Sequence, residues 1–115
     1  MIHTLLLVAL GGALGSSARA LVGMALPFPW ATLAVNVAGG LMMGWLFALL
    51  GAGTALGALL LTGVLGGFTT FSAFSLDTLR LVETGRMAQA GLYVLASVGL
   101  SLLACRAGLW IGRLA

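Results

Sequence analysis

The sequence predicts an all-α integral membrane protein with four transmembrane helices, and three observations support this. The 115 residues are 62% hydrophobic and only 6% charged, and their mean hydropathy is +1.23. No charged residue occurs between Ala20 and Leu76. Crossing a bilayer takes about 20 apolar residues per helix, so the chain has room for four spans with short connections. We expect residues 1–115 to form a single transmembrane domain with both ends on one side.

Helix-breaking residues set the expected ends of these helices. The first helix is expected over about Thr4–Met24, because prolines follow at positions 27 and 29. The second is expected over Trp30–Leu50, before the flexible turn Gly51–Thr54. The third begins near Ala55, and the fourth spans about Met87–Gly112.

The third helix contains the least membrane-like sequence of the chain, the segment GGFTTFSAFS from position 66 to position 75. Its glycine pair, Gly66 and Gly67, predicts a break near the middle of the helix, which resumes over about Ser72–Glu83. Non-helical backbone is tolerated in hydrocarbon only where protein buries it or where it lines a polar cavity. The break therefore predicts a functional site.

Polar residues within the spans are few and fall into groups. Asn36 lies one turn after Thr32 on the second helix, and Tyr93, Ser97 and Ser101 recur at intervals of four on the fourth. Further hydroxyls occur at the break, on Thr69, Thr70, Ser72 and Ser75. Polar side chains are costly in a membrane unless they are partnered or wetted, so their joint occurrence favours a polar pathway.

The chemistry of this lining favours a small anion. Hydroxyl and amide groups donate hydrogen bonds, whereas the first, second and fourth helices carry no carboxylate for a cation path or proton relay. Phe68, Phe71 and Phe74 follow at i, i+3 and i+6 and are expected to share a face. Aromatic ring edges carry positive potential, so they can touch an anion without binding it tightly.

Each of these residues also has a purely structural interpretation. Asn36 can bond to a neighbouring helix, and the phenylalanines can pack against lipid. Asp77, Arg80 and Glu83 are interpreted as a surface ion-pair face. Arg19 is interpreted as a snorkelling or capping residue, and the single cysteine, Cys105, as a small buried apolar residue.

The arginines and glycines favour an oligomer. An even number of helices places Arg19, Arg80 and Arg86 on one face, with Arg113 and Arg106 on the other. Because Lys and Arg near span ends set orientation, this weak bias predicts insertion in both directions as an antiparallel pair. Glycines spaced four apart predict close helix packing, at Gly11/Gly15, Gly40/Gly44, Gly63/Gly67 and Gly108/Gly112.

Three segments resemble the motifs of one family, the small bacterial fluoride channels called Fluc or CrcB. They are GGALGSSAR at 11–19, TLAVNVAG at 32–39 and GGFTTFSAFS at 66–75, which are similar to the family patterns GGxxGxxxR, TLxVNxxG and GGxTTFSTFS. The resemblance covers nearly the whole chain. Ala73 departs from the pattern, where the family has a threonine.

The resemblance implies a dual-topology homodimer of antiparallel subunits in the bacterial inner membrane. Fluoride would leave the cell passively through its pores, which protects the cell from fluoride toxicity. It implies that Arg19 faces a vestibule and that backbone carbonyls of Gly66 and Thr69 hold a structural Na⁺ ion at the dimer centre. The fluoride path would be lined by Asn36, Phe71, Phe74, Tyr93, Ser97, Ser101, Thr32 and Ser72.

Two other functions remain open from the residues alone. A small four-helix proton-coupled drug exporter would need a carboxylate in the first helix, which has none. A structural membrane subunit would not need the hydroxyl series. We expect neither an enzyme nor a nucleic-acid-binding protein, because the sequence shows no nucleotide motif, metal cluster or nucleophile–base pair.

Overall fold

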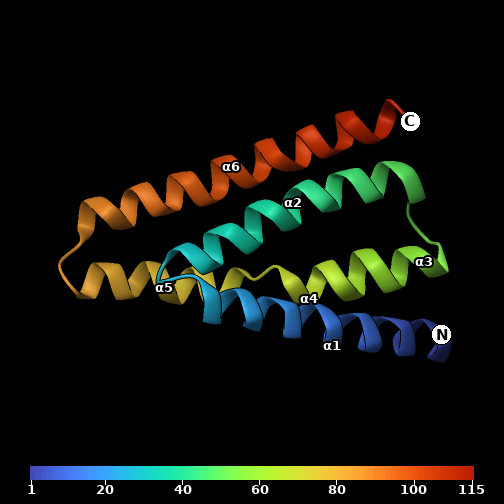
Figure 1. Cartoon of the computed structure of the whole chain (residues 1–115), viewed down its shortest axis with the longest axis horizontal. Helices are drawn as coiled ribbons and strands as arrows, with labels where there is room; N and C mark the ends of the chain where they lie inside the picture. The colour runs from blue at the N-terminus through green and yellow to red at the C-terminus, as the bar shows by residue number, and fades with distance from the viewer.

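The computed structural model describes all residues from Met1 to Ala115 and consists of helices joined by short turns (Figure 1). Four segments are long and apolar enough to cross a membrane. They are helix α1 (Ile2–Ala25), helix α2 (Trp30–Leu50), the composite span Ala55–Glu83 and helix α6 (Met87–Arg113). The predicted all-α architecture with four spans is confirmed.

The third span is built from several segments. In order, they are α3 (Ala55–Gly57), the π-helix η1 (Ala58–Leu65), α4 (Gly66–Phe68) and α5 (Phe71–Glu83). Thr69 and Thr70, between α4 and α5, have extended backbone, with ψ angles of 155° and 125°. Gly66 has helical dihedral angles (φ −61°, ψ −37°), so the expectation that the helix breaks at Gly66 and Gly67 is wrong in position.

Gly67 of this pair, together with Gly63 one turn before it, packs closely against α1. A Cβ atom added to Gly67 would lie 2.7 Å from the carbonyl oxygen of Gly12, and one added to Gly63 would lie 2.9 Å from the Cα of Gly11. Real Cβ atoms essentially never approach other atoms this closely. These glycines therefore let the two backbones touch, which is how small residues stabilise helix pairs in lipid.

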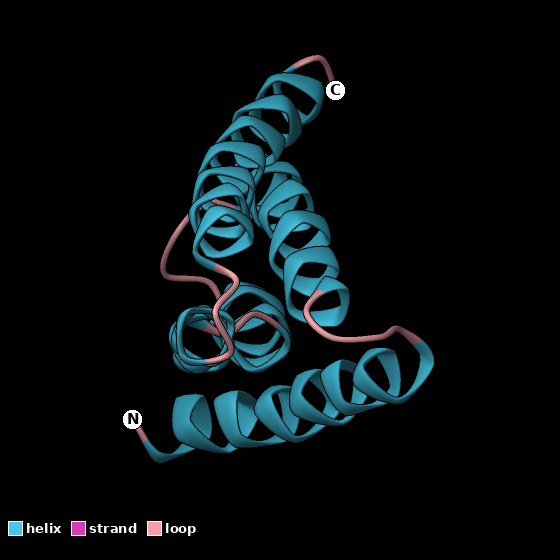
Figure 2. Cartoon of the chain, turned by 90° about the vertical axis from the view of Figure 1, so that its left-hand side faces the viewer, coloured by secondary structure: helices cyan, strands magenta, loops and turns pink.

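A second helix pair, α2 with α6, uses glycines in the same way. A Cβ on Gly44 would lie 2.8 Å from the backbone nitrogen of Leu109, and a Cβ on Gly108 would lie 2.7 Å from that of Trp45. Figures 1 and 2 show α2 beside α6 and α1 beside the third span. The molecule thus consists of two glycine-packed helix pairs.

The two ends of the molecule carry different segments. Figure 1 shows both termini and the Gly51–Thr54 turn at one end, with the α1–α2 and α5–α6 connections at the other. This arrangement is the one predicted from an even number of spans. Gly51 and Gly85, one in a turn at each end, have positive φ angles of 67° and 79°, which glycine adopts without steric cost.

Little of the chain is buried within itself. Only 18 of 115 residues are buried, and large apolar side chains lie exposed along every span. In water such a surface would be unstable, but lipid chains or a second protein surface can cover it.

Substituting Gly15→Ala should destabilise the pairing of α1 with the third span. The added methyl group would meet the backbone nitrogen of Phe68 at 2.8 Å, and such overpacking costs about 1–3 kcal/mol. The measurement is the thermal unfolding temperature of the purified protein in detergent. Gly23→Ala on the same helix is the control, because nothing lies within 4 Å of its Cβ position. Equal unfolding temperatures for the two variants would contradict this account of the packing.

Candidate functional site

A cavity of about 400 Å³ lies between α2, the Thr69–Thr70 link with the start of α5, and α6. It brings together five of the residues predicted to line a pathway: Asn36, Phe71, Phe74, Ser97 and Ser101. No charged side chain lines it. The remaining lining residues are Gly39, Gly40, Met43, Thr69, Thr70, Val98, Leu102 and Cys105.

The side chain of Asn36 holds the extended link in place. Its Nδ2 donates to the carbonyl oxygen of Thr70 at 2.9 Å, and its Oδ1 accepts from the Thr70 N–H at 2.8 Å. The Thr70 hydroxyl in turn accepts from the N–H of Ala73 at 3.1 Å and so caps α5. Asn36 therefore bonds to a neighbouring span, as its structural interpretation predicted, and one of its two amide hydrogens is left for another acceptor.

Two serines of α6 that border the cavity have hydroxyl groups without a hydrogen-bond partner. The hydroxyl oxygens of Ser97 and Ser101 are buried and have no hydrogen-bond partner. Ser97 as a whole is only 5% exposed. An unsatisfied buried polar group costs about 1–3 kcal/mol, so two of them beside one cavity point to a bound acceptor.

The two phenylalanines of α5 lie in contact beside these donors. The rings of Phe71 and Phe74 are 5.4 Å apart in an edge-to-face arrangement, and Phe74 is 5.5 Å from Tyr93. Phe74 is buried, whereas Phe71 is 76% exposed. The expectation that Phe68 shares their helical face is wrong, because Phe68 belongs to α4 and precedes the extended link.

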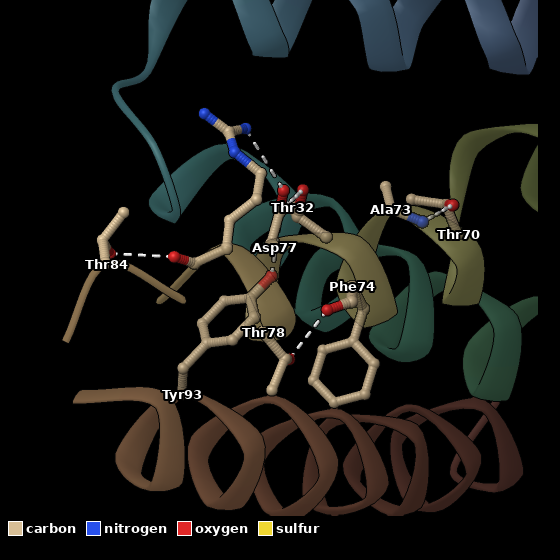
Figure 3. A network of polar contacts seen from close by, with 9 residues as sticks. Thr32, Thr70, Ala73, Phe74, Asp77, Thr78, Thr84 and Tyr93 are labelled. Atoms are coloured by element: carbon tan, nitrogen blue, oxygen red, sulfur yellow. Dashed lines mark hydrogen bonds and ion pairs between the residues drawn. The ribbon is translucent and has the colours of Figure 1, made fainter. Parts of the chain in front are cut away.

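A buried carboxylate lies next to the cavity. Asp77 is only 8% exposed, and its Oδ2 accepts hydrogen bonds from Thr32 at 2.7 Å and from the Tyr93 hydroxyl at 3.3 Å (Figure 3). The nearest guanidinium nitrogen of Arg80 is 3.9 Å from Oδ1. The predicted ion pair of Asp77 with Arg80 is therefore present, but the prediction that Asp77 lies on the surface is wrong. Asp77 lies three residues after the buried Phe74, and this spacing on one helical face could have predicted that Asp77 is buried too.

Thr69, predicted as a sodium ligand, also lines this cavity, whereas Thr32, Ser72, Tyr93, Arg19 and Gly66 lie outside its lining. Tyr93 and Thr32 bond to Asp77, and the exposed Ser72 hydroxyl lies 3.3 Å from that of Thr70. Arg19 donates from Nε to the carbonyl oxygen of Gly67 at 3.1 Å. Arg19 and Thr32 also line a separate, smaller cavity of about 230 Å³.

The extended link frees backbone carbonyls. The N–H of Thr70, which would close the helical hydrogen bond to the Gly66 carbonyl, bonds to Asn36 instead. No hydrogen bond reaches the carbonyl oxygen of Thr69. Oxygen atoms of this kind are the ligands that hard cations prefer.

Together these features define a class: a small four-span membrane protein whose internal site is uncharged and mostly apolar, with two unpartnered hydroxyl groups beside it. Neutral hydrogen-bond donors suit a small anion better than a cation.

Comparison with known proteins identifies the family. Residues 6–109 match the model of the family described as CrcB-like protein, Camphor Resistance (CrcB). The chain is 59% identical to a protein of Paracoccus denitrificans named fluoride-specific ion channel FluC, with 98% of this chain and 97% of that protein covered. A protein of Rhizobium leguminosarum bv. trifolii with the same name is 51% identical, with 94% of each chain covered. A third, from Agrobacterium fabrum, is 50% identical, with 93% of this chain and 94% of that protein covered.

The chain therefore belongs to the CrcB family, and it is a multi-pass protein of the bacterial inner membrane. The family resemblance noted from the three sequence motifs is confirmed.

Substituting Asp77→Ala should destabilise the protein more than Asp77→Asn. The alanine leaves the Thr32 and Tyr93 hydroxyls without their acceptor, at a cost of about 1–3 kcal/mol, whereas asparagine keeps an acceptor oxygen. Thermal unfolding in detergent measures the difference.

Glu83→Ala is the matched control, because Glu83 is exposed and on the same helix. If Asp77→Ala unfolds at the same temperature as Glu83→Ala, the hydrogen bonds to Asp77 do not stabilise the fold.

Proposed function

We propose that this chain forms a fluoride-selective channel that lets fluoride leave the cytoplasm passively and so protects the cell from fluoride toxicity. The observation that carries the proposal is the pair of unpartnered buried hydroxyls, Ser97 and Ser101, beside a cavity without charged residues. The names of the relatives, fluoride-specific ion channel FluC, support the same function.

The cavity lining suits passage of a small anion rather than its tight capture. Ser97 and Ser101 can each donate an O–H to fluoride, and Asn36 retains one amide hydrogen. A lysine or arginine here would bind fluoride strongly and slow its release. Conduction requires binding that is favourable enough for entry and weak enough for exit, which neutral donors provide.

The phenylalanines would complete the path and select the ion. Phe71 and Phe74 lie edge to face, so ring hydrogens with partial positive charge can approach an anion. Such contacts are weaker than hydrogen bonds. Phe71 and Phe74 would let a dehydrated fluoride pass, while Tyr93, Thr32 and Ser72 would lie along the route on either side.

A single chain leaves this path incomplete, which supports an antiparallel homodimer. Phe71 is 76% exposed and borders the cavity, so a second subunit is needed to enclose it. Both ends of the molecule carry arginines, so neither orientation in the membrane is strongly preferred. In this arrangement the third span acts as a broken helix that meets its counterpart at the dimer centre, and Arg19 faces an aqueous vestibule.

The freed carbonyls fit a structural Na⁺ ion at that centre. The Gly66 carbonyl loses its helical donor and the Thr69 carbonyl accepts no hydrogen bond, so both are available as ligands. Each subunit would contribute these two oxygens. The ion, when bound, would neutralise the partial negative charges of carbonyls that otherwise meet at the interface.

A proton-coupled drug exporter is not favoured. That function needs a carboxylate that exchanges protons with cationic substrates. The first helix has none, and Asp77 of the third span accepts hydrogen bonds from Thr32 and Tyr93. The relatives are named ion channels.

Liposomes that contain the purified protein and are loaded with potassium fluoride should release fluoride when valinomycin carries the compensating potassium. A fluoride electrode measures the release, and liposomes loaded with chloride should retain their anion. Phe71→Ile removes the aromatic edge from the path and should sharply reduce the fluoride flux. Phe47→Ile, on α2 outside this cavity, should retain it.

Absence of fluoride-selective flux from the unmodified protein would refute the channel. Equal flux from both phenylalanine variants would remove Phe71 from the path.

Exchanging Na⁺ for N-methylglucamine throughout purification should reduce both the dimer fraction and the fluoride flux, because the bulky organic cation cannot be held by the four carbonyl oxygens. Light scattering coupled to size-exclusion chromatography measures the oligomer. Restoring Na⁺ should restore both. An unchanged dimer with unchanged flux would exclude the sodium site, whereas monomeric protein under both conditions would exclude the dimer.

A further inference from the structure

The exposed side of the last turns of α6 carries two arginines with a tryptophan between them. Arg106, Trp110 and Arg113 follow at i, i+4 and i+7, which places the three side chains on one side of the helix. All three residues are exposed. The opposite side of the same turns packs against α2 through the buried Gly108 and Gly112. Arg106, Trp110 and Arg113 therefore lie on the side away from α2, and we call them the basic face of α6.

No acidic side chain neutralises the basic face. The chain contains only two acidic residues, Asp77 and Glu83, and both belong to α5. The one ion pair of the structure joins Asp77 to Arg80, so neither guanidinium group of the basic face is paired within the chain. Figure 1 shows the C-terminal end of α6 at the opposite end of the molecule from the α5–α6 connection. A neutralising charge for Arg106 and Arg113 therefore has to come from outside the chain.

The two arginines lie at different depths of the span. An α-helix rises about 1.5 Å per residue, so Arg106 lies about 10 Å further along α6 from its C-terminal end than Arg113. A charged side chain within a span is costly unless it is paired or reaches the membrane surface, and the long stem of arginine can extend that far. The guanidinium of Arg106 is therefore expected to extend toward the headgroups, where Arg113 ends the helix. Two positive charges then approach the same headgroup.

A phospholipid with a net negative charge matches the basic face. A guanidinium group can donate two parallel N–H bonds to the oxygens of one phosphate. The indole of Trp110 is 65% exposed and suits the boundary between headgroups and acyl chains, where its N–H can donate as well. Deeper in the span the same side of α6 exposes Leu95 and Leu103, at 72% and 67%, and acyl chains can pack along them. The ammonium group of a zwitterionic lipid would be repelled by the two arginines.

We propose that the basic face of α6 binds an anionic phospholipid, whose phosphate lies between Arg106 and Arg113 beside Trp110. The site is separate from the cavity bordered by Ser97 and Ser101, which lie on the opposite side of α6. Lipid binding at this face does not require that the protein conducts fluoride. In the proposed antiparallel homodimer, one such site would lie in each leaflet.

Native mass spectrometry of the purified protein in detergent counts bound lipids during titration with dioleoylphosphatidylglycerol or dioleoylphosphatidylcholine. The two lipids have the same chains, and the anionic one should bind more tightly. Arg106→Gln and Arg113→Gln should each weaken its binding about tenfold, because each removes charge-assisted hydrogen bonds to the phosphate. Arg86→Gln is the matched control, because it removes the same charge from an exposed residue at the other end of α6, and it should leave the affinity nearly unchanged.

The lipid site is excluded if the two lipids bind equally well, or if Arg106→Gln and Arg113→Gln weaken binding no more than Arg86→Gln does. Glycerol phosphate, which carries the headgroup charge without acyl chains, is added as a competitor in the same titration. It should not displace the lipid at equal concentration, and displacement would overturn the proposal in favour of a site for soluble phosphate compounds. Lipid binding as described by a protein without fluoride flux would refute the channel and leave the lipid site standing.

Discussion

The paired hydrogen bonds between Asn36 and the backbone of Thr70 are the interaction on which the site depends. Leaving a helix inside a membrane exposes peptide groups that water cannot reach, and each unpaired group costs several kcal/mol. Asn36 supplies one donor and one acceptor to the same residue, at 2.9 and 2.8 Å. This arrangement stabilises the extended backbone at Thr69 and Thr70. It also fixes where α5 starts, and hence where Phe71 and Phe74 lie.

Glycines determine the space around that link. On α1 and in the third span they allow backbone contact, so α4 is held against α1 up to the residue where the chain becomes extended. On α2, Gly39 and Gly40 line the cavity opposite Ser97 and Ser101. Larger side chains at these positions would fill the cavity or push α6 away. The same residue type therefore brings helices together and leaves the site open.

The sequence predicted the elements that depend on local chemistry. The bounds of α2 follow from Pro29 and Gly51, and they match the structure. Glycine weakens helices, which predicts a break at Gly66 and Gly67, but glycine also permits close packing, and Gly67 packs against Gly12 of α1 within a helical turn. The π-helix η1, which packs against α1, has no local signature in the sequence.

Only part of the candidate site could be predicted from the sequence, because the rest depends on how the helices pack. Residue type and spacing pointed to Asn36, Ser97 and Ser101, which the structure brings to one cavity. Charge alone suggested an exposed Asp77, whereas its helical register with Phe74 places it against Tyr93. Which partner a polar residue finds depends on the packing of two helices, and the sequence of one helix does not contain that information.

Because of Asp77, the hydroxyl groups along α6 differ in whether they are free to donate a hydrogen bond to a ligand. At one end the Tyr93 hydroxyl, together with that of Thr32, donates to the carboxylate, so neither is free for a second acceptor in this conformation. Further along α6, Ser97 and Ser101 have no acceptor at all. A carboxylate repels an anion, and it withdraws the nearest donors as well. In the proposed channel, the site best suited to an anion would therefore lie on the Ser97 and Ser101 side of Phe74. An ion passing Asp77 would have to replace the carboxylate as the acceptor of the Tyr93 and Thr32 hydroxyls.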